Sequence, residues 1–511
     1  MSHRPTKPTR TPRLLSLTRS DRFFGLRQVP MLRRVAYVIG AVVVAAGLAM
    51  LPAAVTSLIY GERETAGLIT LAALITALAG LLSWRGVGRS GTLTTKEGFA
   101  SVGLAWFAMS IFGMLPYLLT GSIDNLTNAF FETVSGFTTT GASLVSDPSE
   151  LPRGIIMWRS TTQWLGGMGV IVLSLAVLPL LGTGGVQLAR AESPGPEPDR
   201  LTPRFRETAK RLWLLYALLT LVETGLLWAG DMTLFEAINH SLTTMSTGGF
   251  GTEASSIDSY SPYVQWVVIG FMFLAGTSFA LHFRAVQNPG QYLKNTEFRL
   301  FALVLAVATL IIAIGIWGQE SAADTIRDAL FTALALVTTT GFATADFGAW
   351  IPALQLFVVG LMFIGGMAGS TAGGIKIYRM GVLVRAASAD LRRLVYPRGI
   401  FVVRFGANRV HEPVIESVQS FFLFFMFLFM TGTFLLGGLG AVFGPELGLV
   451  EAASATASAL GNIGPALGEM GPSGNYAALT QPGKWLLSLL MIAGRLELFP
   501  VLLLFTRSLW R

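Results

Sequence analysis

Threonine and glycine recur in four short runs of the 511-residue chain. Each run can present carbonyl and hydroxyl oxygens, because threonine is comfortable in extended backbone and glycine permits unusual conformations or close approach. Rings of such oxygens can replace the hydration shell of a cation. The runs carry no carboxylate, which suits a weakly held monovalent cation better than a divalent one. They are TTTG at 138–141, MSTG at 245–248, TTTG at 338–341 and GNIG at 461–464.

A short segment rich in small residues precedes each run, and the four segments resemble one another. The windows that end at the closing glycines read AFFETVSGFTTTG, EAINHSLTTMSTG, ALFTALALVTTTG and AASATASALGNIG. Similar segments at roughly hundred-residue spacing constitute an internal repeat. A single copy could simply pack two membrane helices closely. Four copies on one side of the membrane favour a shared site.

Composition places the chain among integral membrane proteins. It is 52% hydrophobic and 13% charged, whereas soluble proteins carry about 25% charged residues. It has no cysteine, which excludes disulfides, thiolate catalysis and cysteine-based metal sites, and its four histidines are scattered. The sequence shows no constellation of nucleophile, acid and base, so we do not expect an enzyme.

Hydropathy predicts an all-α membrane protein with two extra N-terminal spans and four repeated units. Each unit has an apolar span, a short segment that ends in a run, and a second span. The short segments cannot cross a bilayer and suit re-entrant helices covered by protein, which leaves about ten crossings. First spans are predicted at 99–119, 212–229, 299–317 and 417–443, and second spans at 154–182, 262–283, 351–390 (interrupted) and 485–506.

The predicted domain organisation follows from these spans. A basic tail at 1–34 precedes the extra spans at 35–97, and no cleaved signal peptide is indicated. Units 1 to 4 are predicted at 98–190, 200–290, 295–395 and 408–511.

Loop charges predict the orientation. Loops after the second spans are basic, whereas the loops that carry the runs are acidic, as with Asp147 and Glu150. Basic loops favour the cytoplasm, so both termini are predicted to be cytoplasmic and the runs to open outward. Each short helix would then direct its partly negative C-terminus at the membrane centre, which favours a cation. This distribution explains the net charge of +8 without a nucleic-acid partner.

Two features within predicted second spans suggest function. Five glycines between 365 and 374 cannot hold a lipid-facing helix, so this stretch should be a loop inside the protein or a place of close helix packing. Arg495 falls near the middle of the hydrocarbon core, where a charge needs a cavity, a carbonyl or another partner. Glu132 and Glu236 lie on the short segments, and we expect them to cap or hydrogen-bond there and not to bind the ion.

Several long stretches resemble the TrkH type of the Trk/Ktr/HKT superfamily of potassium transporters. They include LTTKEGFASVGLAWFAMSIFGMLPY (93–117), MWRSTTQWLGGMGVIVL (157–173), MSTGGF (245–250), FIGGMAGSTAGGIK (363–376), TASALGNIGP (456–465) and GRLELFPVLLLF (494–505). The resemblance implies a pseudo-fourfold arrangement of helix–pore-loop–helix units (M1-P-M2) that transports K⁺, sometimes with Na⁺.

The resemblance also implies roles for particular residues. The implied selectivity filter comprises Thr139, Thr140, Gly141, Ser246, Thr247, Gly248, Thr339, Thr340, Gly341, Asn462, Ile463 and Gly464. The implied gate loop comprises Gly365, Gly366, Gly369, Ser370, Thr371, Gly373, Gly374 and Lys376, and Arg495 would face it and the pore. Serine in place of the first filter glycine accompanies Na⁺ preference in plant relatives, so Gly141 favours K⁺.

The implied assembly is a homodimer in the lipid of the inner membrane, resting on a cytosolic TrkA-like nucleotide-binding ring. K⁺ would be the transported ion, with no organic cofactor. Two alternatives stay open, a secondary transporter of an organic solute and a Na⁺-preferring transporter on the same scaffold. The former would need half-helices in inverted halves, whereas these units repeat in one orientation.

Overall fold

Helices make up nearly all of the fold. The computed structural model describes residues 28–87, 94–177, 203–319 and 321–510. The predicted basic tail up to residue 27 and the linker 178–202 between units 1 and 2 therefore lie outside the described residues.

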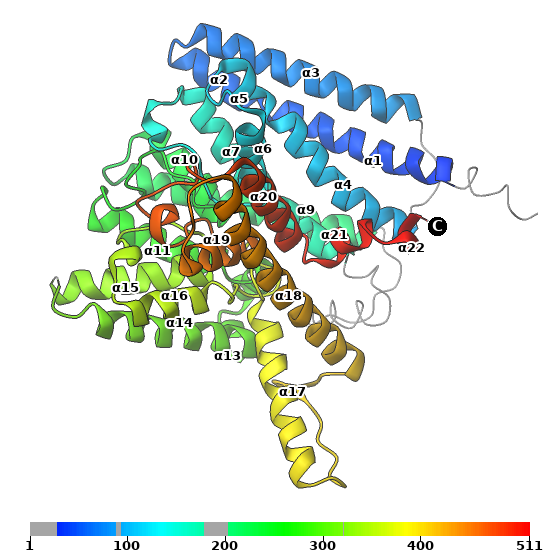
Figure 1. The fold of residues 1–511 in the computed structure, drawn as a ribbon, viewed down its shortest axis with the longest axis vertical. Helices are drawn as coiled ribbons and strands as arrows, with labels where there is room; N and C mark the ends of the chain where they lie inside the picture. Colours follow the sequence, from blue (N-terminus) through cyan, green and yellow to red (C-terminus); the bar gives the residue numbers. More distant parts are fainter. Residues whose placement is uncertain (1–27, 88–93, 178–202, 320, 511) are drawn as a thin grey trace, which may run out of the picture.

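The two extra helices pack along one edge of the bundle (Figure 1). The chain runs through α1 (Gln28–Ala49) and α2 (Leu51–Ile59) and returns as α3 (Arg63–Val87). Small residues bring α1 and α3 together, because a Cβ on Gly40 would lie 2.6 Å from the backbone nitrogen of Trp84. Arg34 of α1 pairs with Glu97 at 3.2 Å, and Glu97 also completes the capping box with Thr94 that begins the next helix.

Each of the four units contains a short buried helix between longer elements. Unit 1 comprises α4 (Thr95–Gly113), α5 (Leu115–Thr120), α6 (Leu126–Phe137), η1 (Pro148–Glu150) and α7 (Arg153–Val177). Unit 2 comprises α9 (Pro203–Trp228), α10 (Leu234–Met245), α11 (Pro262–Ala275) and α12 (Phe279–Gln287).

Units 3 and 4 follow the same order. Unit 3, entered through α13 (Gln291–Lys294), comprises α14 (Thr296–Gly315), α15 (Ala322–Val337), η3 (Phe347–Ala349), α16 (Pro352–Leu361) and α17 (Ile377–Val395). Unit 4 comprises α18 (Glu412–Phe443), α19 (Leu449–Gly461), η4 (Gly468–Met470), α20 (Gln481–Arg495), α21 (Phe499–Leu504) and α22 (Arg507–Trp510). The short helices α6, α10, α15 and α19 are the predicted re-entrant segments.

A small hairpin adds to the predicted all-α fold. Strands β1 (Arg404–Phe405) and β2 (Asn408–Arg409) pair antiparallel and connect α17 to α18. Together with α17 the hairpin projects from the bundle, at the bottom of Figure 1.

The prediction of about ten full crossings includes second spans that the structure shows as broken helices. Six described helical segments are long and apolar enough to cross a membrane, and the pair α11 and α12, bent by 98°, makes a seventh. The predicted spans 262–283 and 485–506 are each broken. The first breaks at 276–278, where glycine is followed by two hydroxyl residues, and the second breaks at 496–498, where Glu497 and Leu498 have positive φ.

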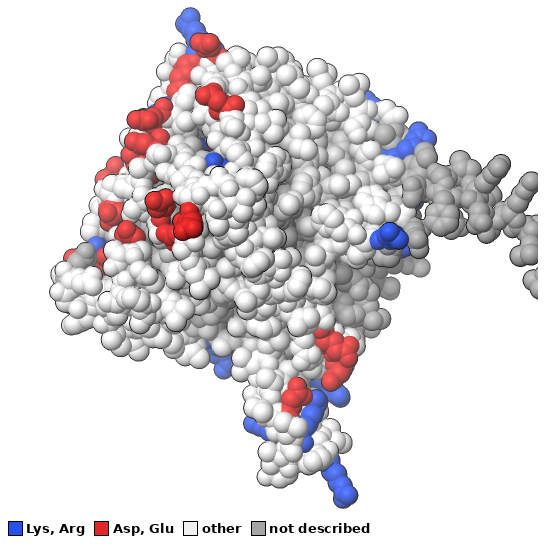
Figure 2. Space-filling view, in the orientation of Figure 1, with Lys and Arg blue, Asp and Glu red and all other residues white. Residues whose placement is uncertain are grey.

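The surface is consistent with a bundle embedded in lipid. Large apolar side chains point outward from the long helices, with Leu221 69% and Phe434 79% exposed. Extended apolar surface of this kind marks contact with a membrane or a partner. Acidic side chains gather along the upper left edge of the face in Figure 2, and basic ones are prominent on the α17 hairpin beside a smaller acidic group.

Candidate functional site

All four short helices end in the same backbone conformation. The second residue after the helix in units 1 to 3, and the first in unit 4, adopts a left-handed conformation, and a glycine two positions later has positive φ again. We call residues 138–141, 246–249, 338–341 and 461–464 the turn segments. Their left-handed residues are Thr139, Thr247, Thr339 and Asn462 (φ 53–57°), and their closing glycines are Gly141, Gly249, Gly341 and Gly464 (φ 75–111°).

The register predicted for unit 2 is one residue off. By backbone conformation Gly249, and not Gly248, corresponds to Gly141, while Gly248 corresponds to Thr140. Letter matching placed STG against TTG, but α10 ends at Met245, so Ser246 takes the place of Thr138. Two consecutive glycines left the sequence without a signal for which of them has positive φ.

Backbone amides of the turn segments donate hydrogen bonds to carbonyls of their own helices. In unit 1 the Thr140 amide donates to the carbonyl of Ser135 at 2.9 Å. The same bond occurs in the other units, where Gly248, Thr340 and Ile463 donate to Thr243, Ala335 and Ser458 at 2.8, 2.8 and 3.0 Å. Since these donors are satisfied, the carbonyl oxygens remain as the groups that the segments can offer to a ligand.

The turn segments contact one another in a closed cycle. At each closing glycine, an added Cβ would collide with a carbonyl oxygen of the neighbouring unit, so glycine is required by space as well as by φ. The order of contacts is unit 1 to 2, 2 to 3, 3 to 4 and 4 to 1. The added Cβ would lie 2.2 Å from Gly248 O at Gly141, 2.0 Å from Thr340 O at Gly249, 1.8 Å from Ile463 O at Gly341 and 2.6 Å from Thr140 O at Gly464.

A cavity of about 100 Å³ lies against this cycle, and all four closing glycines line it. The acidic loop residue Glu253 and the buried Arg159 also border it. The convergence that the repeat predicted is therefore present, since turn segments far apart in the sequence meet at one hollow.

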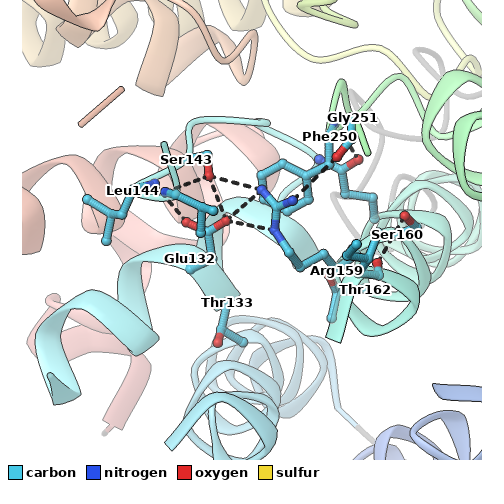
Figure 3. Close-up of polar contacts among 12 residues, drawn as sticks. Glu132, Thr133, Ser143, Leu144, Arg159, Ser160, Thr162, Phe250 and Gly251 are labelled. Atoms are coloured by element: carbon cyan, nitrogen blue, oxygen red, sulfur yellow. Dashed lines mark hydrogen bonds and ion pairs between the residues drawn. The ribbon is translucent and has the colours of Figure 1, made fainter. Parts of the chain in front are cut away.

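Arg159 and Glu132 form a buried ion pair beside the cavity (Figure 3). Arg159 Nη2 lies 2.9 Å from Glu132 Oε1, and both side chains are at least 98% buried. Glu132 also accepts hydrogen bonds from Ser143 Oγ and the Leu144 amide, each at 2.9 Å. The guanidinium of Arg159 lies 4.2 Å from the centre of the Phe250 ring, so the pair connects units 1 and 2. This role of Glu132 reaches beyond its own helix, unlike our expectation, whereas Glu236 does complete a capping box with Thr233.

Each unit ties its returning strand to its short helix three residues after the closing glycine. In unit 1 Glu132 holds the Leu144 amide. In the other units the bonds join His240 to Thr252 at 3.1 Å, Asp328 to Thr344 at 3.0 Å, and Ser454 to the Leu467 amide at 3.0 Å. The geometry repeats while the chemistry differs, which explains why letter matching did not detect it.

The predicted break in unit 3 is a loop inside the protein, from 362 to 376, between α16 and α17. It contacts a turn segment and the C-terminal end of one of the short helices. The Gly373 amide donates to Thr339 Oγ1 at 2.7 Å, and Thr371 Oγ1 donates to the carbonyl of Met245 at 3.1 Å. Ser370 and Thr371 are almost fully buried, and Lys376 donates to the carbonyl of Ala372.

Arg495 is buried and bonded to backbone carbonyls. Its Nη1 donates to Thr371 O in the loop at 2.8 Å, and its Nη2 donates to Gly166 O of α7 at 3.1 Å. Two residues on, Glu497 pairs with Arg379 of α17 at 2.6 Å. The chain around the break in unit 4 is therefore bonded both to the loop and to α17, the helix that follows the loop.

The comparisons with known proteins decide the family. The family model described as TrkH, cation transport protein, matches residues 66–510. This chain belongs to the TrkH family. The Trk system potassium uptake protein TrkH of Salmonella typhimurium is 35% identical, with 94% of this chain and 99% of the relative covered. TrkG of Escherichia coli, also named a Trk system potassium uptake protein, is 33% identical over the same shares.

A solved structure agrees with this assignment. The crystal structure of the potassium transporter TrkH from Vibrio parahaemolyticus matches with a TM-score of 0.85 and 32% identity, covering 94% of this chain and 100% of that one. The TrkH family is a class of cation transporters, not of enzymes. In this TrkH-family chain the sequence singled out the runs, the glycine-rich stretch and Arg495, and the structure brings them together.

Sequence reasoning missed two residues of the site, Arg159 and Gln163 on α7. Both are buried and both contact unit 2. The available signal was a polar, charged stretch, RSTTQW at 159–164, within a predicted membrane span. Intramembrane polar residues of this kind usually mark function or a partner.

Proposed function

We propose that this chain takes up K⁺ across the bacterial inner membrane through a selectivity filter formed by the four turn segments. The observation that carries the proposal is the closed cycle in which each closing glycine touches a neighbouring unit's carbonyl oxygen. Neutral oxygens crowded around one axis suit a monovalent cation. The names of the relatives, potassium uptake proteins and a potassium transporter, support K⁺ as that cation.

The filter includes the predicted residues together with Gly249. In this proposal units 1 to 4 (98–190, 200–290, 295–395 and 408–511) form a pseudo-fourfold pore of M1-P-M2 repeats. The short helices contribute their partly negative C-termini, because each ends where its turn segment begins. Gly141, rather than serine, favours K⁺ over the Na⁺-preferring alternative.

The loop at 362–376 would act as the gate. It lies against Thr339 and the end of α10, and Arg495 holds its backbone at Thr371. A glycine-rich loop can rearrange at low conformational cost. Its gating residues are those predicted, from Gly365 to Lys376.

The assembly is proposed from the resemblance. It is a homodimer with cytoplasmic termini that rests on a cytosolic TrkA-like nucleotide-binding ring. The basic α17 hairpin, with Arg392, Arg398 and Arg404, is the surface that would meet the ring, because basic segments favour the cytoplasmic side.

The test is rescue of a K⁺-uptake-deficient bacterium on low-K⁺ medium. We expect growth with the wild-type chain and loss of growth, or loss of K⁺ preference over Na⁺, with Gly141→Ser. The matched control is Gly61→Ser, because Gly61 has the same φ of +81° but open space where its Cβ would lie. Failure of the wild-type chain to rescue, or equal rescue by Gly141→Ser, would overturn the proposal.

A further inference from the structure

The turn segments of units 1 and 3 are connected internally by paired hydroxyls. Thr138 Oγ1 lies 2.7 Å from Thr140 Oγ1, and Thr338 Oγ1 lies 2.8 Å from Thr340 Oγ1. In each pair the first threonine also bonds to its own helix, as with Thr138 to the carbonyl of Val134 at 2.7 Å. Each pair therefore fixes the segment that carries the carbonyls to the helix behind it.

Unit 2 cannot make this connection. Its equivalent positions are Ser246 and Gly248, and glycine has no hydroxyl to pair. Ser246 Oγ still bonds to its own helix at the carbonyl of Leu242 at 2.8 Å. Unit 2 therefore keeps the hydroxyl that bonds to the helix and lacks the second hydroxyl, at Gly248.

The side chain of Gln163, from α7 of unit 1, occupies the vacant place. Gln163 is fully buried. Its Nε2 donates to the carbonyl of Gly248 at 2.7 Å, and its Oε1 accepts from the Phe250 amide at 3.1 Å. A Cβ added to Gly248 would lie only 2.3 Å from Gln163 Oε1. A side chain at position 248 therefore requires the Gln163 side chain to move.

The two bonds also fix which way the amide faces, because one partner is a carbonyl and the other an N–H. Glutamine supplies a donor and an acceptor in this arrangement, whereas an ionised glutamate supplies acceptors alone. One turn earlier on α7, Arg159 lies over the Phe250 ring, so residues four apart on one helix face hold the same strand.

We propose that Gln163 is a positioning residue for cation selection, which replaces the missing threonine hydroxyl of unit 2 and sets its Gly248 carbonyl. This inference rests on the proposed filter. The carbonyl that Gln163 holds is the one against which Gly141 packs, so the position of the joint between units 1 and 2 depends on this amide.

The test is an exchange of residues between the two positions. Gln163→Ala removes the support, and Gly248→Thr introduces a side chain that collides with the amide. The double variant Gln163→Ala/Gly248→Thr frees the space and supplies the hydroxyl that units 1 and 3 use. Gly248 has no positive φ, so threonine is compatible with its backbone.

The readouts are the KM for Rb⁺ uptake and its inhibition by Na⁺, normalised to the protein present in membranes. We expect each single change to raise KM about tenfold, the usual order for an unmet buried carbonyl, and to strengthen inhibition by Na⁺. The double variant should return to within about threefold of wild type, which is less than independent defects would give. Gln265→Ala is the control, since Gln265 is also buried but bonds to Tyr260 O in an outer loop.

The outcomes separate the two proposals. Absence of K⁺ or Rb⁺ uptake by the wild-type chain would overturn the filter itself. Wild-type uptake with unchanged KM and Na⁺ inhibition in Gln163→Ala would overturn only the role of Gln163. A double variant whose KM rises by the product of the two single fold-changes would also overturn the role of Gln163. If the singles fail to accumulate, recovery of protein and KM together in the double variant supports the role, and continued loss contradicts it.

Discussion

Glycine is required in the turn segments for two different physical reasons. Gly141 and Gly341 need both a positive φ and the absence of a Cβ, because a neighbour's carbonyl oxygen lies where that Cβ would be. Gly248 needs only the space, which the amide of Gln163 fills. We therefore expect that substitutions at the first two positions cannot be compensated by a second side-chain change, whereas a substitution at Gly248 can.

The buried pair of Glu132 and Arg159 yields a prediction about stability. Glu132→Gln leaves the Arg159 charge buried without its counter-ion, which costs about 3–5 kcal/mol. We expect a clear drop in the unfolding temperature of the detergent-solubilised protein, measured by the loss of monodisperse material after heating.

The comparison is with an exposed pair. Arg393 and Asp390 lie 2.8 Å apart with side chains 43% and 56% exposed, so Arg393→Gln should cost at most about 1 kcal/mol. Adding Arg159→Met to Glu132→Gln should recover part of the loss, because the uncompensated charge is removed. A Glu132→Gln protein as stable as wild type would show that the charge is not buried as described.

At the scale of elements, broken helices shape the site. Units 2, 3 and 4 have second helices that stop near the turn segments, at 276–278, 362–376 and 496–498. The breaks of units 2 and 3 expose backbone groups that bond to each other, as when Met367 donates its amide to the carbonyl of Gly276 at 2.9 Å, whereas the break of unit 4 reaches another unit through the Glu497 side chain. Such backbone is tolerated inside a membrane only where protein or water satisfies it.

Arg495 yields a prediction about gating. It is the link between the loop at Thr371 and α7 at Gly166. We expect Arg495→Gln to raise cation flux, because the loop loses its charge-assisted hydrogen bond from Arg495, worth about 1.5–3 kcal/mol, and with it the tie to α7. Rb⁺ flux into proteoliposomes of purified protein measures this directly.

The matched control is Arg385→Gln. Arg385 bonds to the carbonyl of Gly381 within its own helix, at 2.9 Å, and not to the loop. Flux that is equal in wild type and Arg495→Gln, at equal reconstitution, would exclude Arg495 as a restraint on the gate.

The sequence predicted elements whose pattern is local. The repeat, the short helices and the glycine-rich break in unit 3 were each visible as composition over about ten residues. The breaks at 276–278 and 496–498 were not visible in this way, because AGTS and RLEL resemble the polar end of an ordinary membrane span. The second break also depends on the positive φ of Glu497 and Leu498. The register of unit 2 depended on which of two adjacent glycines turns, and the role of Gln163 depended on a contact between units. Tertiary contacts decided both.

At the scale of the whole molecule, acidic and basic side chains gather on different parts of the surface. The cavity at the turn segments is bordered by Glu253, and acidic residues crowd one edge of the molecule in Figure 2. An acidic mouth raises the local concentration of cations, and salt screens the effect over about 10 Å at 0.1 M.

Glu253 makes this mouth sensitive to pH. Burial, followed by the nearby carboxylates of Glu236 and Asp147, raises the pKa of Glu253. Its negative charge is therefore lost at a higher pH than that of an ordinary glutamate. The loop charges predict that the cavity opens outward, so acidification of the outside would remove this charge. We expect the KM for Rb⁺ to rise as the external pH falls through this raised pKa, and Glu253→Gln to show the raised KM at every pH.

The measurement is Rb⁺ uptake at low ionic strength over an external pH series. In high salt the difference between wild type and Glu253→Gln should shrink, because screening removes the long-range attraction. Glu446→Gln serves as the control, since this exposed acidic residue is not among those that line the cavity. A salt-independent effect of Glu253→Gln would contradict an electrostatic origin.

The closed cycle of turn segments also bears on how such a chain can evolve. In a ring of four identical subunits, a substitution enters every joint at once. Here one polypeptide carries all four quarters, so each joint can change alone, as with the Gln163 amide between units 1 and 2 and the Asn462 amide that donates to Thr140 Oγ1 at 3.0 Å between units 4 and 1. A single unit transplanted from a relative would therefore supply only one partner of each of its two contacts with neighbouring units. We infer that exchange between such proteins succeeds only when adjoining units are transferred together.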